Sequence, residues 1–228
     1  MEKLILFDID YTLLKNAVSH RTAFIESVKE TYGLDTNLEK ISYIGLTDQQ
    51  ILVALLKEYG LPEGEILRKA PAFMEKAAEV FLNIIGNDRS IRLLDGVRDL
   101  IREMDQRGFL LGLVTGNIKQ IARGKLVKFG LWHYFKVGGF GCDHPERAAL
   151  VNYAVQRAEN NFNFTREHNV FLFGDTANDI DAGKTAGVFT FGVATGSCSP
   201  KDLAEAGATY VLDNLKDTGR IIDLINSK

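Results

Sequence analysis

Residues 3–12 read Lys3-Leu4-Ile5-Leu6-Phe7-Asp8-Ile9-Asp10-Tyr11-Thr12. The almost continuous apolar run over 3–7 is typical of a strand that is buried on both faces of a parallel sheet. Asp8 and Asp10 then follow this strand directly. Two acids that end an otherwise apolar strand predict a chemical role rather than a simple turn.

Similar apolar runs recur later in the chain. One covers 109–114 and ends in Thr115, and another covers 170–173 and ends in Gly174-Asp175. Helical apolar stripes precede both runs, and weaker strand candidates follow at 188–193 and 209–212. Alternating strands and helices predict βαβ units with right-handed crossovers. We therefore expect an α/β fold with a doubly wound, Rossmann-like parallel sheet.

The segment 16–90 interrupts this alternation, because it reads as helices only. The predicted helices cover 19–31, 48–59 and 65–85, and Pro71 is a point where the third could be disturbed. An insertion directly after the first strand predicts a helical cap over the sheet edge. We expect a core of residues 1–15 and 91–228 and a cap of residues 16–90, with hinges near 14–18 and 87–95.

The amino-acid composition argues against several classes of protein. The chain has 228 residues, 46% of them hydrophobic, which is enough for a large core. A net charge of -3 without a basic run gives no surface for nucleic acid. Cys142 and Cys198 are the only cysteines, so neither a disulfide framework nor a thiolate zinc site is expected. The sequence offers no signal peptide or membrane span, and we expect a cytoplasmic protein.

The polar residues that follow the three main strands predict the chemistry. In open α/β sheets, ligands bind outside the carboxyl ends of the strands. Four carboxylates gather there, and like charges at this density require a counter-cation. Oxygen-only ligands suit a hard ion such as Mg²⁺, which commonly binds carboxylates together with a phosphate. The acids are Asp8, Asp10, Asp175 and Asp179.

Three motifs in this order resemble the haloacid dehalogenase superfamily. They are Asp8-x-Asp10-x-Thr12, the Thr115 after a hydrophobic strand, and Gly174-Asp175-x-x-x-Asp179. The helical insertion resembles that superfamily's cap of the first insertion type, and the similarity to its phosphoglycolate-phosphatase-like branch covers the whole chain.

The resemblance implies a role for each acid. Asp8 would attack phosphorus and become an acyl phosphate, and Asp10 would donate and then accept a proton, which requires a raised pKa when substrate arrives. Mg²⁺ would bind the Asp8 carboxylate, the Asp10 carbonyl and Asp175, with Asp179 close by. Phosphate oxygens would be held by Thr115, Gly116 and Asn117.

The cation of the third motif departs from the family pattern, in which a Lys precedes a Pro. Arg147 is the favoured substitute, and Lys125 is the competing candidate. Arg presents a planar fork and Lys a point charge, so the exchange is not neutral. In the cap, Thr47 begins the loop that we expect to meet the leaving group, although it is also a good helix N-cap. His20 corresponds to a histidine of the similar β-phosphoglucomutases, but a solvent-facing position is the more common outcome.

We therefore predict a Mg²⁺-dependent phosphatase acting on a small phosphate monoester, such as phosphoglycolate or a sugar phosphate. A dehalogenase is disfavoured, because it has no use for Asp10 or a magnesium site. A phosphomutase of the same fold and a non-catalytic phosphate-binding module remain as alternatives. The sequence leaves monomer and dimer open.

Overall fold

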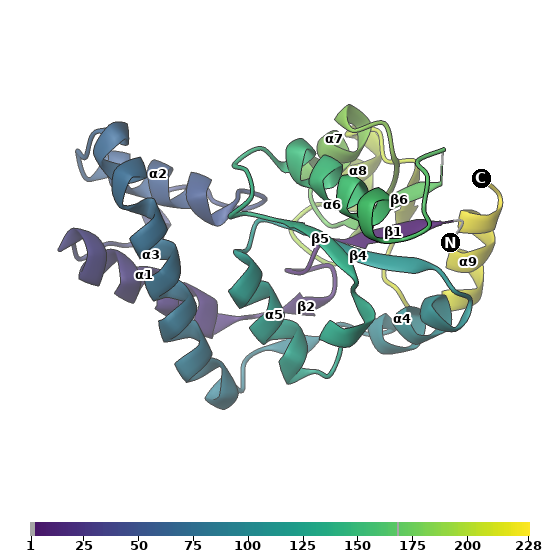
Figure 1. Cartoon of the computed structure of the whole chain (residues 1–228), viewed down its shortest axis with the longest axis horizontal. Coiled ribbons are helices and arrows are strands. Elements are labelled where there is room, and N and C mark those ends of the chain that lie inside the picture. Colours follow the sequence, from purple (N-terminus) through teal and green to yellow (C-terminus); the bar gives the residue numbers. More distant parts are fainter. Residues whose placement is uncertain (1–2, 168) are drawn as a thin grey trace.

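The computed structural model describes residues 3–167 and 169–228. A six-stranded parallel sheet forms its core, in the order β5-β4-β1-β6-β7-β8 (Figure 1). The chain moves from β1 outward to β4 and β5 and then returns to β6, so the sheet changes direction beside β1. This arrangement confirms the predicted doubly wound α/β fold. The strands are β1 (Leu4–Phe7), β4 (Leu110–Thr115), β5 (Val137–Phe140), β6 (Val170–Gly174), β7 (Phe189–Val193) and β8 (Tyr210–Leu212).

Strand β1 is buried on both faces, as its apolar run predicts. Ile5 and Phe7 point into one hydrophobic cluster, and Leu4 and Leu6 point into another. Phe7 stacks on Phe173 of β6, with ring centroids 4.8 Å apart. The core helices that complete these layers are α4 (Val97–Gln106), α5 (Lys119–Lys128), α6 (Arg147–Asn161), α7 (Ala177–Thr185), α8 (Pro200–Glu205) and α9 (Thr218–Asn226).

Strand β5 was not among the predicted strands, because its sequence Val-Gly-Gly-Phe weakens the usual strand signal. Both glycines lie in crowded surroundings. A Cβ on Gly139 would collide with the backbone of Leu150 in α6, and one on Gly138 would crowd the ring of Phe140. Tight packing around β5 therefore explains the two glycines, and these glycines are the reason that the sequence pattern did not predict the strand.

The segment 16–90 forms three helices at the left of Figure 1, and we refer to it below as the cap. Its third helix continues through Pro71 without a break. Two short antiparallel strands, β2 (Leu14–Lys15) and β3 (Arg92–Leu93), lie where the chain enters and leaves the cap, near both predicted hinges. The cap helices are α1 (Val18–Tyr32), α2 (Asp48–Glu58) and α3 (Glu63–Ile84), with short turns η1 (Leu38–Lys40) and η2 (Ile85–Asn87).

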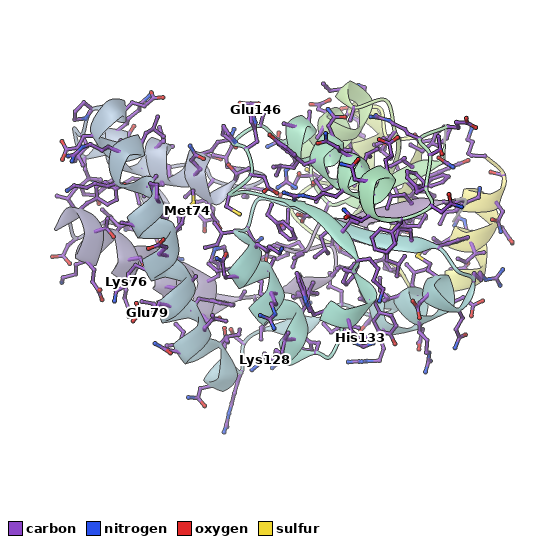
Figure 2. The ribbon with its side chains drawn as sticks, viewed as in Figure 1. Met74, Lys76, Glu79, Lys128, His133 and Glu146 are labelled. Atoms are coloured by element: carbon purple, nitrogen blue, oxygen red, sulfur yellow. The ribbon has the colours of Figure 1, made fainter. Side chains whose placement is uncertain are left out.

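Helix α5 links the core to the end of α3. Figure 2 labels Lys128 on α5 and Glu79 on the neighbouring part of α3. The Lys128 ammonium donates to the carbonyl oxygens of Ile85 and Gly86, at 2.9 and 3.0 Å. This contact closes the turn after α3 onto the core. Among the described residues, no helix has the length and apolar character needed to cross a membrane.

Candidate active site

Three buried aspartates meet at the carboxyl edge of the sheet. Asp8 directly follows β1, Asp175 directly follows β6, and Asp179 lies in the first turn of α7. One carboxylate oxygen from each lies within 4.8 Å of those of the other two. All three residues are at most 4% exposed. We call Asp8, Asp175 and Asp179 the carboxylate cluster.

Two glycines allow the carboxylate cluster to pack this closely. A Cβ on Gly174 would collide with the Asp179 side chain, and one on Gly196 would collide with the Asp175 carboxylate. Asp179 is further fixed by a capping box, in which its carboxylate accepts from the Thr176 backbone N–H at 3.1 Å and its own N–H donates to the Thr176 hydroxyl at 3.3 Å. The sequence therefore supplies both the acids and the space they require.

Arg147 is the cation that faces Asp8. It is the first residue of α6, and its Nη1 donates to Asp8 at 3.2 Å and to Asp179 at 2.5 Å. The guanidinium side chain is only 10% exposed. Its Nε is buried without a partner within the described chain. Arg147, the favoured candidate from the sequence, thus contacts Asp8, and its Nε is left over as a donor for a ligand.

The cluster carries more negative charge than Arg147 offsets. Burial raises the pKa of Asp8 to about 7, with Asp179 and Asp10 adding to the rise and Arg147 opposing it. Burial also raises the pKa of Asp175 to about 8, helped by Asp8 and Asp179. The raised pKa values mean that the two carboxylates are unfavourable in their charged forms when they are both buried here. A bound cation would offset this excess negative charge.

The Asp10 carboxylate has different partners from Asp8. The Lys125 ammonium donates to both of its oxygens, at 2.8 and 2.7 Å, and the Asn117 amide donates to one at 2.7 Å. Burial would raise the pKa of Asp10, but Lys125, then His20 and these hydrogen bonds lower it below its usual value. The expected raised pKa is therefore not found in the free site. Lys125, the competing candidate for the Asp8 partner, is instead the partner of Asp10.

Lys125 uses each of its three donors. Besides Asp10, it donates to Asn117 Oδ1 at 2.6 Å and lies 3.1 Å from His20 Nδ1, and its side chain is fully buried. An ammonium can only donate, so a hydrogen bond at the His20 contact would need Nδ1 to accept and the ring hydrogen to be on Nε2. That nitrogen lies 3.2 Å from Asp48. His20 therefore lies within the site, and not in solvent as expected.

Asp48 also attaches the cap to the core. Its carboxylate accepts from the backbone N–H of Ile118 at 2.9 Å, and its own N–H donates to the carbonyl of Gly116 at 2.9 Å. From the sequence, Asp48 was expected only as part of the cap loop 47–50 that meets the leaving group, or as an N-cap of the following helix, and its contact with the core was not predicted. The available signal was an acid at the start of a predicted helix, which ordinarily means only a favourable charge near the helix N-terminus.

Four further residues were predicted to bind substrate, and only two of them line the cavity. Gly116 and Asn117 line the cavity that contains Asp8 and Asp10. Thr115 is fully buried, and its hydroxyl accepts from the Asn117 amide at 2.7 Å. Thr47 is also fully buried; it forms a capping box with Gln50 and donates to the Pro145 carbonyl at 3.3 Å. Asp48, not Thr47, is the residue of this pair that lines the cavity.

The carboxylate cluster fits a divalent metal by the chemistry of its donors. Three carboxylates at one point form a hard, oxygen-only ligand set of the type that Mg²⁺ or Ca²⁺ prefers. The set contains no thiolate or imidazole, the ligands that favour zinc. Fold and site together define a capped α/β protein whose acidic sheet edge has a ligand set that could hold a metal.

Comparison with known sequences identifies the family. The profile of the haloacid dehalogenase-like hydrolases matches residues 5–193, and the chain belongs to this family. A phosphoglycolate phosphatase from Vibrio cholerae is 25% identical over 228 residues, covering 98% of this chain and 96% of the relative.

Solved structures show the same fold. A predicted phosphatase from Clostridium acetobutylicum superposes with a TM-score of 0.72 at 18% identity, covering 97% of this chain and 98% of the other. The β-phosphoglucomutase from Clostridium difficile gives a TM-score of 0.71 at 20% identity, covering 100% and 98%. The likeness therefore includes the cap as well as the core.

Proposed function

We propose that the chain is a Mg²⁺-dependent phosphatase that hydrolyses small phosphate monoesters through an aspartyl-phosphate on Asp8. One observation carries the proposal: Asp8 and Asp10 line the same cavity, but different cations hold them. Asp8 is joined to the carboxylate cluster and Arg147, and Asp10 to Lys125. Such a separation provides one carboxylate for attack and another for proton transfer.

The metal would be held by Asp8, Asp175 and Asp179, where it would neutralise charge on the phosphoryl group. Arg147 orients the Asp8 carboxylate, and its unpaired Nε can donate to a phosphoryl oxygen. Asp8 attacks phosphorus while the alkoxide leaves, and Asp10, which must be protonated when the charged substrate is bound, supplies the alkoxide's proton. Asp10 then takes a proton from the water that cleaves the acyl phosphate. Positioning and charge neutralisation are the main contributions that phosphoryl transfer requires.

Asp8→Asn is the direct test. With a panel of phosphate esters and Mg²⁺, we expect the variant to lose more than about 10³-fold in kcat, because it lacks the nucleophile. Acid-quenched wild-type protein should carry one phosphoryl group on the peptide that contains Asp8. Full activity of Asp8→Asn would rule out the covalent route, and a wild type inactive on the whole panel would favour a non-catalytic phosphate-binding module.

A phosphomutase is the second candidate, because His20 lies in the site and contacts Lys125. A mutase returns the phosphoryl group to a second hydroxyl and needs a bisphosphate primer. Incubation of a sugar phosphate with and without such a primer separates the two functions. Release of inorganic phosphate without the primer supports the phosphatase, and an isomeric sugar phosphate formed only with the primer supports the mutase.

A further inference from the structure

The cavity between cap and core is lined by two chemically different sets of side chains. Its volume is about 490 Å³. The core supplies Asp8, Asp10 and Arg147. The cap supplies a set of apolar side chains, which we call the apolar wall. The apolar wall consists of Val18, Phe24, Leu38, Tyr43, Ile44 and Ile51.

Several residues at this cavity expose unusually large apolar surfaces. Val18 is 56% exposed and Ile44 59%, and Tyr11, on the core side, is 44% exposed. All three line the same cavity. Exposed apolar residues that gather at one concave site are typical of a ligand-binding surface.

The cap's His20, Asp48 and Arg21, which line the cavity, already have partners within the described part of the chain. His20 is held between Lys125 and Asp48, and Asp48 is also bound to the core backbone. Arg21, the other cap cation that lines the cavity within the described chain, is 47% exposed and faces Glu39 at 3.5 Å. A carboxylate on the leaving group would therefore lie against apolar side chains or compete with Glu39 at the rim.

We propose that the leaving group is an uncharged, apolar alcohol that packs on the apolar wall, so that the substrates are phosphate monoesters of alkyl or aryl alcohols larger than glycolate. This inference rests on the proposed phosphatase function. Cavities of ~300–1,000 Å³ hold drug-sized ligands, and glycolate would fill only a small part of this one. Burial of each further methylene on the wall then contributes to binding.

A series of n-alkyl phosphates tests the inference. Ethyl, butyl and hexyl phosphate release alcohols of nearly equal acidity, so differences in kcat/KM report how the chain binds. We expect a gain of about two- to fourfold per methylene, the upper value corresponding to full burial of a CH₂ group. Phosphoglycolate should be at least about tenfold poorer than butyl phosphate. A series that is flat or falls with chain length, or a preference for phosphoglycolate, would overturn the inference.

Ile44→Asn connects the preference to the apolar wall. The side chain is 59% exposed, so the fold should tolerate the change, and its thermal unfolding can be compared with that of the wild type. We expect the ratio of kcat/KM for hexyl over ethyl phosphate to fall at least threefold. Leu67→Asn is the matched control, because Leu67 is also exposed (39%) but lies on α3 outside the cavity lining. Equal ratios in both variants would contradict the assignment of the wall.

The two proposals fail in different ways. Hydrolysis of phosphoglycolate that depends on Asp8 but shows no gain with alkyl length would leave the phosphatase function standing and overturn the leaving-group inference. Absence of hydrolysis of every ester in the presence of Mg²⁺ would overturn the phosphatase function itself.

Discussion

Two aspartates separated by one residue have opposite electrostatic environments. Burial, together with the nearby Asp179 and Asp10 carboxylates, raises the pKa of Asp8 to about 7 although Arg147 opposes the rise. Asp10 is paired with Lys125 and Asn117, and its pKa is lowered. After β1, the Asp8 carboxylate lies in the carboxylate cluster, whereas the Asp10 carboxylate lies against Lys125 of α5. Two neighbouring residues can thus take two different roles in phosphoryl transfer.

Lys125→Met should reduce activity by removing the group that holds Asp10. General acid–base catalysis contributes about 10²–10⁴-fold, so we expect kcat to fall by about 10²-fold. The pKa on the alkaline limb of the kcat/KM profile should rise, because Asp10 must be protonated for the first step and the ammonium that lowers its pKa is gone. Steady-state kinetics between pH 4 and 9 measure both effects.

Lys119→Met is the control for that variant, since Lys119 lies on the same helix but is exposed. Loss of one member of a buried ion pair costs about 3–5 kcal/mol of stability, so denaturant unfolding should first establish that Lys125→Met is folded. A folded Lys125→Met variant with wild-type kcat and an unshifted pH profile would refute the role.

The carboxylate cluster should make stability depend on pH and metal. Without metal, Asp175 has a folded pKa of about 8 against about 3.9 in the unfolded chain. The folded state therefore binds the proton more tightly, and the free energy of unfolding falls as pH rises between these two values. Asp175→Asn removes this loss, so its melting temperature should exceed that of the wild type at pH 8 and approach it at pH 4.

Added Mg²⁺ should reverse that order at pH 8. A metal bound only by the folded state raises stability, and Asp175→Asn lacks one of its ligands. Thermal scans with and without Mg²⁺ would show a rise for the wild type and little change for the variant. Equal responses of the two proteins would mean that Asp175 is not a ligand.

Individual elements were predictable to different degrees. Apolar runs identified strands β1, β4 and β6 because both faces of these strands are buried, and periodicity identified the three cap helices. Strand β5 was missed because it contains two glycines, which are uncommon in strands. Gly139 is required by the close packing of α6, and a sequence pattern does not reveal such a tertiary contact.

The same limit applies to the site. Residues that follow strands could be placed together, because the ends of parallel strands share one edge. Two contacts of the site could not be predicted in this way. Lys125 contacts Asp10 across 115 positions of sequence, and Asp48 contacts Ile118 across 70. Lys125 and Asp48 lie on helices, where no strand end indicates that a residue belongs to the site. Packing of α5 within the core brings Lys125 to Asp10, and the docked cap brings Asp48 to Ile118.

The loop before α2 is the element that docks the cap, and it needs a glycine on the core side. A Cβ on Gly116 would lie 2.6 Å from the carbonyl oxygen of Leu46 and 2.9 Å from the Cα of Thr47. Both contacts are with backbone, which cannot rotate away. Gly116→Ala should therefore hold the cap open, raising KM and lowering kcat by about 10-fold or more, since closure positions the substrate and excludes water.

Gly64→Ala is the matched control, because a Cβ at Gly64 meets no atom within 4 Å. Gly64 lies in the first turn of α3, where Ala is the better helix former. It should keep wild-type kinetics and at least wild-type stability. Wild-type kinetics for Gly116→Ala as well would show that this close approach is not required for turnover.

At the scale of the whole molecule, core and cap divide the chemistry between them. The sheet edge concentrates charge, while the cap contributes apolar surface and only a few polar contacts to the core. One of these is the hydrogen bond from Asn178 of α7 to the carbonyl of Gly45, at 3.1 Å. The cap is covalently joined to the core only through the chain segments that carry β2 and β3 (Figure 1). The cap thus has two chain connections to the core and a limited set of polar contacts with it. This arrangement favours movement of the cap as a unit.

Hydrogen exchange should therefore detect cap closure at two particular amides. The N–H groups of Asp48 and Ile118 bond across the boundary, each at 2.9 Å, and are protected only when the cap is docked. Adding Mg²⁺ with orthovanadate, a phosphoryl mimic, should slow exchange in peptides covering 43–50 and 116–120. Peptides covering 150–158 of α6, within the core, should not change. Asp48→Ala removes the carboxylate that accepts from Ile118 and should abolish the slowing at 116–120, and an equal response in that variant would mean that the carboxylate does not hold the cap closed.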